Sequence, residues 1–309
     1  MRRYYPLKEF LKERFGCRVY RVSLDAGLTC PNRDGTKGRG GCTFCNNSTL
    51  SHPPDTGGRE IGEQLTRGME YLRRRRGADK FIAYLQPNSN TYAPIESLER
   101  FYREATGHPD VVALAISTRP DCLGEEVLDL LDGFSRTIFL WLELGLQSVK
   151  DATLLALNRG HTVADFEEAL DSAVQRGIPV CAHVILGLPG ESRGDMVSTA
   201  RFIARHNVWG VKLHPLHIQR GTRLEELYRK GEVRVLDLDE YAERVVEFLE
   251  ELPPQTVIHR LSGSTPKRFL VAPSWGADRF TPPAIIRKLL EKRDTSQGAK
   301  SPSATEQRY

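Results

Sequence analysis

The sequence of 309 residues has no long apolar run and no apolar targeting segment. No stretch approaches the ~18 consecutive apolar residues that indicate a membrane-spanning helix. The first residues, MRRYYPLKEFLKERFG, carry early positive charge, but the continuous apolar segment of a signal peptide does not follow them. We therefore expect no membrane association and a cytoplasmic location.

Cysteine is too scarce for a disulfide-stabilised fold, since the chain has only six. In a reducing compartment, thiols that cluster in sequence indicate metal or redox chemistry instead. Neither sign of charge dominates: the net charge is +4 and the isoelectric point is near 8.7. This balance permits a polyanionic partner without requiring one.

Basic residues gather in two places. The N-terminal segment combines them with Tyr4 and Tyr5, and an unbroken run contains Arg73, Arg74, Arg75 and Arg76. Such a run is typical of a solvated helix C-terminus, which favours cations, but it also suits contacts with phosphate. We keep these arginines and both tyrosines as candidates for substrate binding.

Segments typical of strands alternate with segments typical of helices. The predicted strands are 18–23, 80–86, 111–118, 137–147, 180–187, 210–218 and 256–261, and the predicted helices are 61–75, 95–105, 165–176, 192–205 and 239–252. This order predicts an α/β fold with parallel strands and an active site at their carboxyl ends. A doubly wound sheet and a barrel both fit the pattern. Residues 294–309 are polar, and we expect a disordered tail there.

Three cysteines, Cys30, Cys42 and Cys45, lie in one glycine-rich stretch after the first predicted strand, CPNRDGTKGRGGCTFC. Three thiolates can hold three irons of a [4Fe–4S] cluster and leave the fourth iron open to an outside ligand. A zinc site and a structural loop are the alternatives, because the Cys-x-x-Cys spacing also serves zinc. Structural zinc takes four ligands, and the stretch contains neither histidine nor a fourth cysteine.

The segment LDAGLTCPNRDGTKGRGGCTFCNN resembles the cluster loop of a radical S-adenosylmethionine (SAM) family of the YtqA/YhcC type, which is related to the catalytic subunit of Elongator. Further resemblances follow in order: LQPNSNTYAP (85–94), ISTRPDCL (116–123), LELGLQS (142–148), NRGHT (158–162), HVILGLPGE (183–191) and KLHPLHIQRGT (212–222). They imply a partial (β/α)6 TIM-like barrel with short N- and C-terminal extensions. We expect one domain over 1–293, with the cluster loop at 27–47 and the C-terminal extension at about 222–293.

The resemblance also implies the cofactors. Cys30, Cys42 and Cys45 would hold a [4Fe–4S] cluster whose open iron binds SAM. Reductive cleavage of SAM would give a 5′-deoxyadenosyl radical that abstracts hydrogen from the substrate. The electron would come from a donor such as flavodoxin or ferredoxin.

The predicted SAM-binding residues lie at strand ends: Gln86, Asn88, Ser89, Asn90, Glu143, Gln147, Arg159, His161, Gly187, Pro189, Glu191 and Lys212. Amide side chains suit the amine and carboxylate of methionine, because they both donate and accept hydrogen bonds. Three alternatives stay open at this point. They are a strand-end turn for the amides, a structural salt bridge for Glu143 and helix capping for Glu191.

Catalytic residues are not identified by the sequence, and the candidates are His214, His217 and Cys122. Arg119 is a further candidate for binding an anionic substrate group or the SAM carboxylate, and a surface ion pair is its alternative. Because the Elongator relative modifies the wobble uridine of tRNA, the resemblance implies tRNA as the partner. A small metabolite or a peptide is the alternative substrate. A non-catalytic zinc or iron–sulfur module that binds nucleic acid is the alternative of another class.

Overall fold

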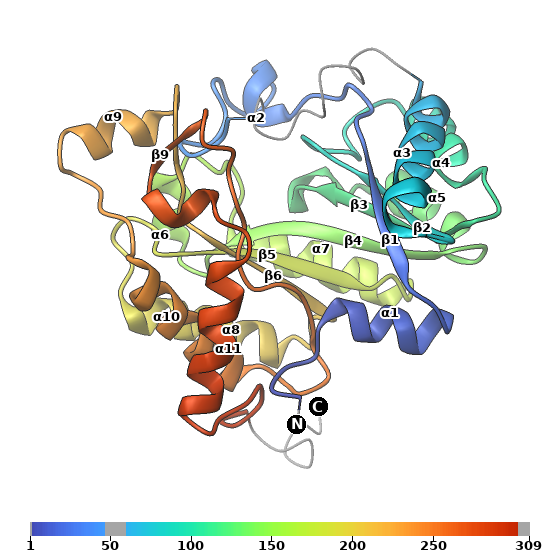
Figure 1. The fold of residues 1–309 in the computed structure, drawn as a ribbon. Helices are drawn as coiled ribbons and strands as arrows, with labels where there is room; N and C mark the ends of the chain where they lie inside the picture. Colours follow the sequence, from blue (N-terminus) through green and yellow to red (C-terminus); the bar gives the residue numbers. More distant parts are fainter. Residues whose placement is uncertain (1, 47–59, 302–309) are drawn as a thin grey trace.

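The structure is a computed structural model that describes residues 2–46 and 60–301. Its main sheet has seven parallel strands and curls into a half-barrel (Figure 1). In spatial order they are β1 (Val19–Leu24), β2 (Lys80–Leu85), β3 (Val111–Thr118), β4 (Phe139–Gln147), β5 (Val180–Leu186), β6 (Gly210–Pro215) and β8 (Val257–Arg260). The predicted partial barrel is confirmed, with β8 as a seventh strand beside β6.

Helices cover the convex face of the sheet. They are α3 (Ile61–Arg76), α4 (Ile95–Thr106), α5 (Glu125–Ser135), α7 (Val163–Gln175), α8 (Arg193–Arg205) and α10 (Leu238–Glu251). Figure 1 shows α3, α4 and α5 along one side of the curled sheet and α8 and α10 along the other. Alternate residues of β4, Leu140 and Leu142 among them, join the main core with these helices. The intervening β4 residues therefore face the concave side.

One helix, α1 (Leu7–Phe15), closes the concave side where the strands begin. It contacts both edge strands, β1 and β8, and Ile258 donates its backbone N–H to Tyr5 O at 2.7 Å. Leu7 and Leu11 pack in a second apolar cluster with Trp141 and Cys181 from the sheet. Apolar contacts thus fill the lower half of the barrel, where the strands begin. Polar side chains occupy the upper half, nearer the carboxyl ends of the strands.

The remaining elements are short connections and the C-terminal extension: α2 (Pro31–Asp34), a 3₁₀ turn at Pro120–Cys122, α6 (Asp151–Ala156), β7 (Ile218–Gln219), α9 (Arg223–Arg229), β9 (Leu270–Ala272), a 3₁₀ turn at Ser274–Ala277 and α11 (Thr281–Lys292). The predicted strand 210–218 was too long, because β6 ends at Pro215 and Ile218 pairs antiparallel with β9. None of the helices in the described residues is long and apolar enough to cross a membrane.

The predicted disordered tail was wrong for residues 294–301. Gln297 is only 6% exposed, and its Nε2 donates to Pro253 O at 2.6 Å and to Thr256 O at 2.8 Å. One glutamine amide satisfies two buried carbonyl groups, a contact that the polar composition of the segment does not reveal. Residues 302–309 lie outside the described part of the chain, as does Asn47 at the end of the predicted cluster loop.

Candidate active site

The cysteine loop follows β1 and begins with Cys30, directly before α2. Cys45 donates its backbone N–H to Cys42 O at 2.9 Å, and Asn32 Nδ2 lies 3.5 Å from the Cys42 sulfur. Burial raises the pKa of the Cys45 thiol to about 11, and the neighbouring Cys42 and Cys30 add to this rise. Because neighbouring thiolates oppose the ionisation of Cys45, a bound cation such as iron would stabilise them.

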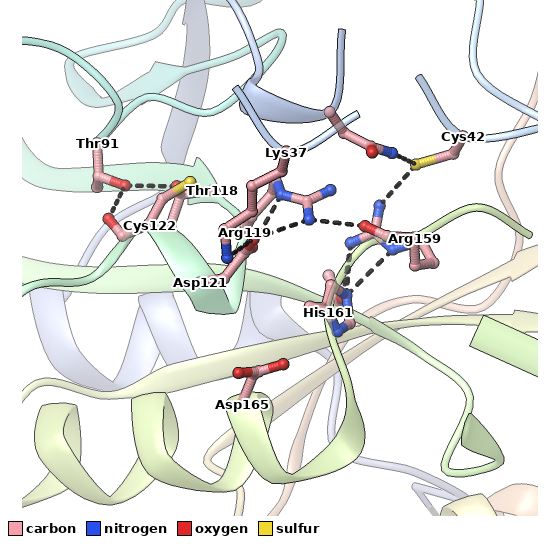
Figure 2. A network of polar contacts seen from close by, with 12 residues as sticks. Lys37, Cys42, Thr91, Thr118, Arg119, Asp121, Cys122, Arg159, His161 and Asp165 are labelled. Atoms are coloured by element: carbon pink, nitrogen blue, oxygen red, sulfur yellow. Dashed lines mark hydrogen bonds and ion pairs between the residues drawn. The ribbon is translucent and has the colours of Figure 1, made fainter. Parts of the chain in front are cut away.

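Arg159, in the connection that follows α6, reaches this loop from the other side. Its Nη1 donates to Cys42 Sγ at 3.2 Å (Figure 2), and its Nη2 donates to Gly145 O at 2.9 Å. Its Nε donates to His161 Nε2 at 3.1 Å. Burial and the charge of Arg159 lower the pKa of His161 to about 4, so the imidazole is a neutral acceptor at pH 7. The His161 ring thus orients a guanidinium that touches a cysteine sulfur.

Arg119 follows β3 and extends the same network (Figure 2). It donates to both carboxylate oxygens of Asp121, at 2.8 and 3.0 Å, and to Arg159 O at 2.6 Å. Lys37 of the cysteine loop also pairs with Asp121, at 2.8 Å. The Arg119 residue is 4% exposed, and within the described chain its Nη1 has no hydrogen-bond partner. One buried donor is therefore left for a ligand.

The amides after β2 hold the backbone around the cysteine loop. Asn88 Nδ2 donates to Leu28 O at 2.7 Å. Asn90 Nδ2 donates to the carbonyls of Pro87 at 2.9 Å and Ser117 at 3.0 Å. These contacts are turn chemistry, so Nδ2 of Asn88 and of Asn90 is engaged by protein. Gln86 and Ser89 lie in the same turn, where Ser89 is 1% exposed. The role of these four residues toward SAM stays a prediction.

The upper concave face carries a layer of polar side chains, here called the concave layer: Arg21, Tyr84, Glu143, His183, Lys212 and Arg260. Glu143 is at its centre and accepts hydrogen bonds from Lys212 Nζ at 2.5 Å, Tyr84 OH at 2.7 Å and His183 Nε2 at 2.8 Å. Burial acts to raise the pKa of Glu143, but the charge of Lys212 and the hydrogen bond from His183 outweigh it and hold that pKa well below its usual range. These contacts fit the structural salt bridge that was the alternative for Glu143, and its role toward SAM stays a prediction.

A β-bulge brings Arg260 into this layer. In the pairing of β6 with β8, Val211 is opposite Ile258 and Lys212 is opposite Arg260, so His259 is the extra residue. Paired residues of neighbouring strands share a face, and Arg260 therefore faces the concave side with Lys212. On the far edge, Arg21 lies with its guanidinium carbon 4.8 Å from the Tyr84 ring centroid.

The concave layer has an excess of positive charge. It contains three cations and one carboxylate, and Lys212 already neutralises Glu143. Within residues 2–46 and 60–301, Arg21 and Arg260 take part in no ion pair. Burial, then the charge of Arg21, lowers the pKa of Arg260. An anionic group that entered the half-barrel would relieve this repulsion.

Two of the candidate catalytic residues, His214 and His217, lie at the upper end of β6 and just beyond it. Each has a buried Nε2 without a hydrogen-bond partner in the described chain. His214 packs against His183 with ring centroids 5.6 Å apart and the rings tilted by 35°, and His217 Nδ1 lies 2.9 Å from Thr265 Oγ1. Burial lowers the pKa of His217 to about 4, so this ring is neutral at pH 7.

The third candidate, Cys122, lies in the 3₁₀ turn after β3. Thr91 Oγ1 donates to its carbonyl oxygen at 2.7 Å. Burial raises the pKa of the Cys122 thiol to about 12. The thiol is therefore protonated at neutral pH, which disfavours it as a nucleophile.

The GLPGE turn after β5 is shaped by packing. Gly187 has φ +84°, and a Cβ there would lie 2.8 Å from Leu236 Cγ. Ser148 donates to Glu191, whose pKa is raised by burial. Gln147 ends β4 with φ +69°. Pro189 and Glu191 line a cavity of about 330 Å³ that also borders Leu236.

Other predicted substrate residues lie apart from this site. Arg73, Arg74, Arg75 and Arg76 form the exposed C-terminal end of α3, just before β2 begins and thus at the opposite end of the sheet. Arg73 pairs with Asp110 at 2.6 Å. Tyr5 donates to Glu13, whereas Tyr4 lines a separate cavity beside β8. The helix-end interpretation of the arginine run fits this placement.

Several site residues were missed by sequence reasoning: Asn32, Arg21, Tyr84, His183 and Arg260. A signal existed for Tyr84 and His183, because polar atoms inside otherwise apolar strands need partners. No comparable signal marked Arg260, because its orientation depends on the bulge. Within the described residues, no three His, Cys, Asp or Glu side chains are arranged as a site for a single metal ion. A cluster spreads its irons, and therefore its thiolates, more widely than one ion does.

The fold and the cysteine loop define an iron–sulfur enzyme on a partial TIM barrel. The family model of the Radical SAM superfamily matches residues 33–203, and that of the Radical_SAM C-terminal domain matches residues 208–292. The chain belongs to the radical SAM superfamily, and its cofactors are a [4Fe–4S] cluster and SAM.

Relatives support the same assignment along most of the chain. The chain is 38% identical over 300 residues to YtqA of Bacillus subtilis, covering 96% of this chain and 92% of YtqA. It is 38% identical over 290 residues to YhcC of Escherichia coli, covering 94% and 93%. Identity to human Elongator complex protein 3 is 30% over 184 residues, covering 58% of this chain and 32% of that protein.

Among solved structures, an archaeal Elp3 from Methanocaldococcus infernus with an N-terminal deletion has a TM-score of 0.70 at 20% identity. The match covers 90% of this chain and 64% of that one, and at this identity it shows the shared fold. The predicted relationship to YtqA, YhcC and the Elongator subunit is confirmed.

Proposed function

We propose that this radical SAM enzyme acts on tRNA and modifies the wobble uridine. The observation that carries the proposal is the positive concave layer, in which Arg21 and Arg260 have no carboxylate partner among the described residues. An anionic substrate suits such a face better than a neutral metabolite. The relationship to Elongator complex protein 3 directs the choice among anionic substrates toward tRNA.

Within this proposal, Cys30, Cys42 and Cys45 hold the cluster, and the strand-end residues from Gln86 to Lys212 surround SAM. When bound, the cluster and SAM supply a 5′-deoxyadenosyl radical that removes hydrogen from a substrate carbon. Arg119 Nη1 is a buried donor suited to a carboxylate. The neutral His214 and His217 orient a substrate group without adding charge. The apolar cluster around α1 excludes water from below.

The cell must also provide an electron. Reduction by a flavodoxin or ferredoxin fits the need for a low-potential donor. We expect the enzyme to work in the reducing cytoplasm, since none of its six cysteines forms a disulfide.

The decisive experiment for the substrate is mass spectrometry of tRNA nucleosides from cells with and without this protein. We expect one modified uridine at the wobble position to disappear, with its precursor accumulating, and to return when the gene is restored. Identical nucleoside profiles in both strains would contradict the tRNA proposal while leaving the radical SAM assignment intact.

The cluster ligands are tested separately in the purified protein. Anaerobic reconstitution should give about four irons per chain and reductive formation of 5′-deoxyadenosine. Cys42→Ala should lose the cluster, whereas Cys181→Ala, a buried cysteine of β5 in the apolar cluster under the barrel, should keep it. A Cys42→Ala chain that still cleaves SAM would refute the assignment of this ligand.

A further inference from the structure

A cavity of about 500 Å³ lies beside the edge strand β8, next to the start of α1 and the residues before α11. Its polar lining, here called the cationic pocket, consists of Tyr4, Lys8, His259, Arg260, Ser262, Ser264 and Arg279. The three formally charged side chains of the pocket are cations from three different parts of the chain. The described residues that line the cavity include no Asp or Glu.

The charge of the pocket is not cancelled by neighbours. Within the described chain, Lys8, Arg260 and Arg279 take part in no ion pair. Asp278 is adjacent to Arg279 in sequence, but its carboxylate accepts the backbone N–H groups of Phe280 at 2.8 Å and Thr281 at 3.1 Å. These bonds cap the start of α11 and direct Asp278 to the helix. Three cations with hydroxyl groups beside them are a donor set that suits phosphate oxygens.

An exposed aromatic ring lies next to this pocket. Phe280 is 71% exposed, and the guanidinium carbon of Arg279 lies 4.7 Å from its ring centroid. Proteins that bind single-stranded nucleic acid combine backbone cations with rings on which bases stack. RNA recognition relies on such unpaired, splayed bases in loops. A phosphorylated metabolite would use the cations but has no need of the ring.

The cationic pocket and the concave layer of the active site share one residue, Arg260. Arg260 lines the cavity and also belongs to the concave layer, because the bulge at His259 turns it toward Lys212. A chain of nucleotides that passes the edge of β8 would therefore place one phosphate in the pocket and the next nucleotide in the half-barrel. Helix α1 and Pro6 lie against the edge strands β8 and β1, so the RNA would pass on the side of Arg260, at the carboxyl end of β8.

We propose that the cationic pocket binds a backbone phosphate of single-stranded RNA beside the nucleotide that enters the half-barrel, and that Phe280 stacks a neighbouring base. This inference rests on the proposed RNA substrate and adds where that RNA is held. Besides Arg260 of the concave layer, it concerns Lys8 of α1 and Arg279 and Phe280 before α11, which are exposed and which no step of the SAM chemistry uses.

The test measures binding of an anticodon stem-loop RNA to the full-length, anaerobically reconstituted protein over a range of salt concentrations. Lys8→Gln combined with Arg279→Gln should weaken binding about tenfold or more at low salt. It should also make the salt slope shallower by about 0.7, since the neutralisation of one phosphate is lost. Arg74→Gln combined with Arg75→Gln removes the same charge at the opposite end of the sheet and should leave both quantities near wild type.

The aromatic part of the proposal has its own control. Phe280→Ala should weaken binding of the stem-loop about fivefold or more, whereas a fully paired RNA duplex of equal length should be unaffected. Phe280→Tyr should restore stem-loop binding. Equal losses for the stem-loop and the duplex would overturn the stacking of an unpaired base.

Two results would overturn the RNA site as a whole. The first is unchanged stem-loop affinity in the Lys8 and Arg279 double variant, or an equal loss in the Arg74 and Arg75 control. The second is binding of inorganic phosphate that the double variant loses while RNA affinity stays constant, which would assign the pocket to a free phosphate compound. The tRNA substrate is tested independently by the nucleoside analysis in cells. If cells modify the wobble uridine but the double variant binds RNA normally, the pocket proposal is wrong and the tRNA proposal stands.

Discussion

Arg159 donates a hydrogen bond from Nη1 to the sulfur of Cys42 at 3.2 Å. The arginine is only 6% exposed, and Gly145 O and the neutral His161 ring fix its other nitrogens. A buried positive charge is thereby held against a proposed cluster ligand. Hydrogen bonds and charges near cysteine sulfurs tune the reduction potential of iron–sulfur clusters. We therefore expect Arg159 to influence the reduction potential of the cluster through Cys42.

Replacing this arginine should change the reduction potential without removing the cluster. Arg159→Met keeps all three cysteines, so iron content should stay near wild type, but the lost charge should make the potential more negative. Arg159→Lys should shift it less. A potentiometric titration followed by electron paramagnetic resonance measures both, and an unchanged potential in Arg159→Met would contradict the role.

Local patterns predicted most of the sheet. The expected strand 111–118 coincides with β3, and the expected helix 61–75 is one residue shorter than α3. Apolar runs rich in β-branched residues identify strands covered on both faces, and glycines such as Gly77 mark helix ends. The order of the motifs along the chain identified the family, and the spacing of the cysteines identified the loop.

Long-range contacts were beyond local patterns. Helix α1 was not predicted. It fills the barrel between β1 and β8, which are far apart in sequence, and a local pattern does not reveal such contacts. The partners of Glu143 lie on β2, β5 and β6, so a lone carboxylate in a strand reveals the need for partners but not their identity. The contact of Arg159 with Cys42 depends on the chain's return from α6. Only the folded half-barrel brings these groups together.

The buried pair of Glu143 and Lys212 predicts a strong energetic coupling. Glu143→Gln should lower the free energy of unfolding by about 3–5 kcal/mol, because it leaves the Lys212 ammonium buried without a counter-charge. Adding Lys212→Met should recover most of that loss, since no isolated charge remains. Urea denaturation of the two single variants and the double variant measures the coupling, and additive losses would contradict it.

Alanine substitutions at Gly187 and Gly190 distinguish the cost of a packing clash from the cost of backbone strain in the GLPGE turn. Both have positive φ, +84° and +76°, but only Gly187 faces a neighbour, Leu236, where a Cβ would lie. Gly190→Ala should cost about 1–2 kcal/mol from backbone conformation alone. Gly187→Ala should cost a further ~1–3 kcal/mol from the clash. Thermal denaturation compares the stabilities of the two alanine variants. Adding Leu236→Ala to both should reduce the difference between them. Equal costs for the two alanine variants would contradict the packing role of Gly187.

The buried histidines predict a loss of stability in mild acid. Burial lowers the pKa of His183, His217 and His259 from 6.5 to about 4. Between pH 6.5 and 4 the unfolded chain therefore binds more protons than the folded chain. The free energy of unfolding should fall as the pH falls through this window, by up to about 1.4 kcal/mol per pH unit for each histidine.

His217 offers the clearest test of this pH dependence, because its one hydrogen-bond contact in the described chain is with Thr265. His217→Gln removes one titrating group, so its stability should decline less steeply than that of wild type from pH 6.5 to 4. Above pH 6.5 the two curves should run parallel, which serves as the internal control. Urea denaturation across this range measures both curves, and equal slopes below pH 6.5 would show that His217 does not titrate with a lowered pKa.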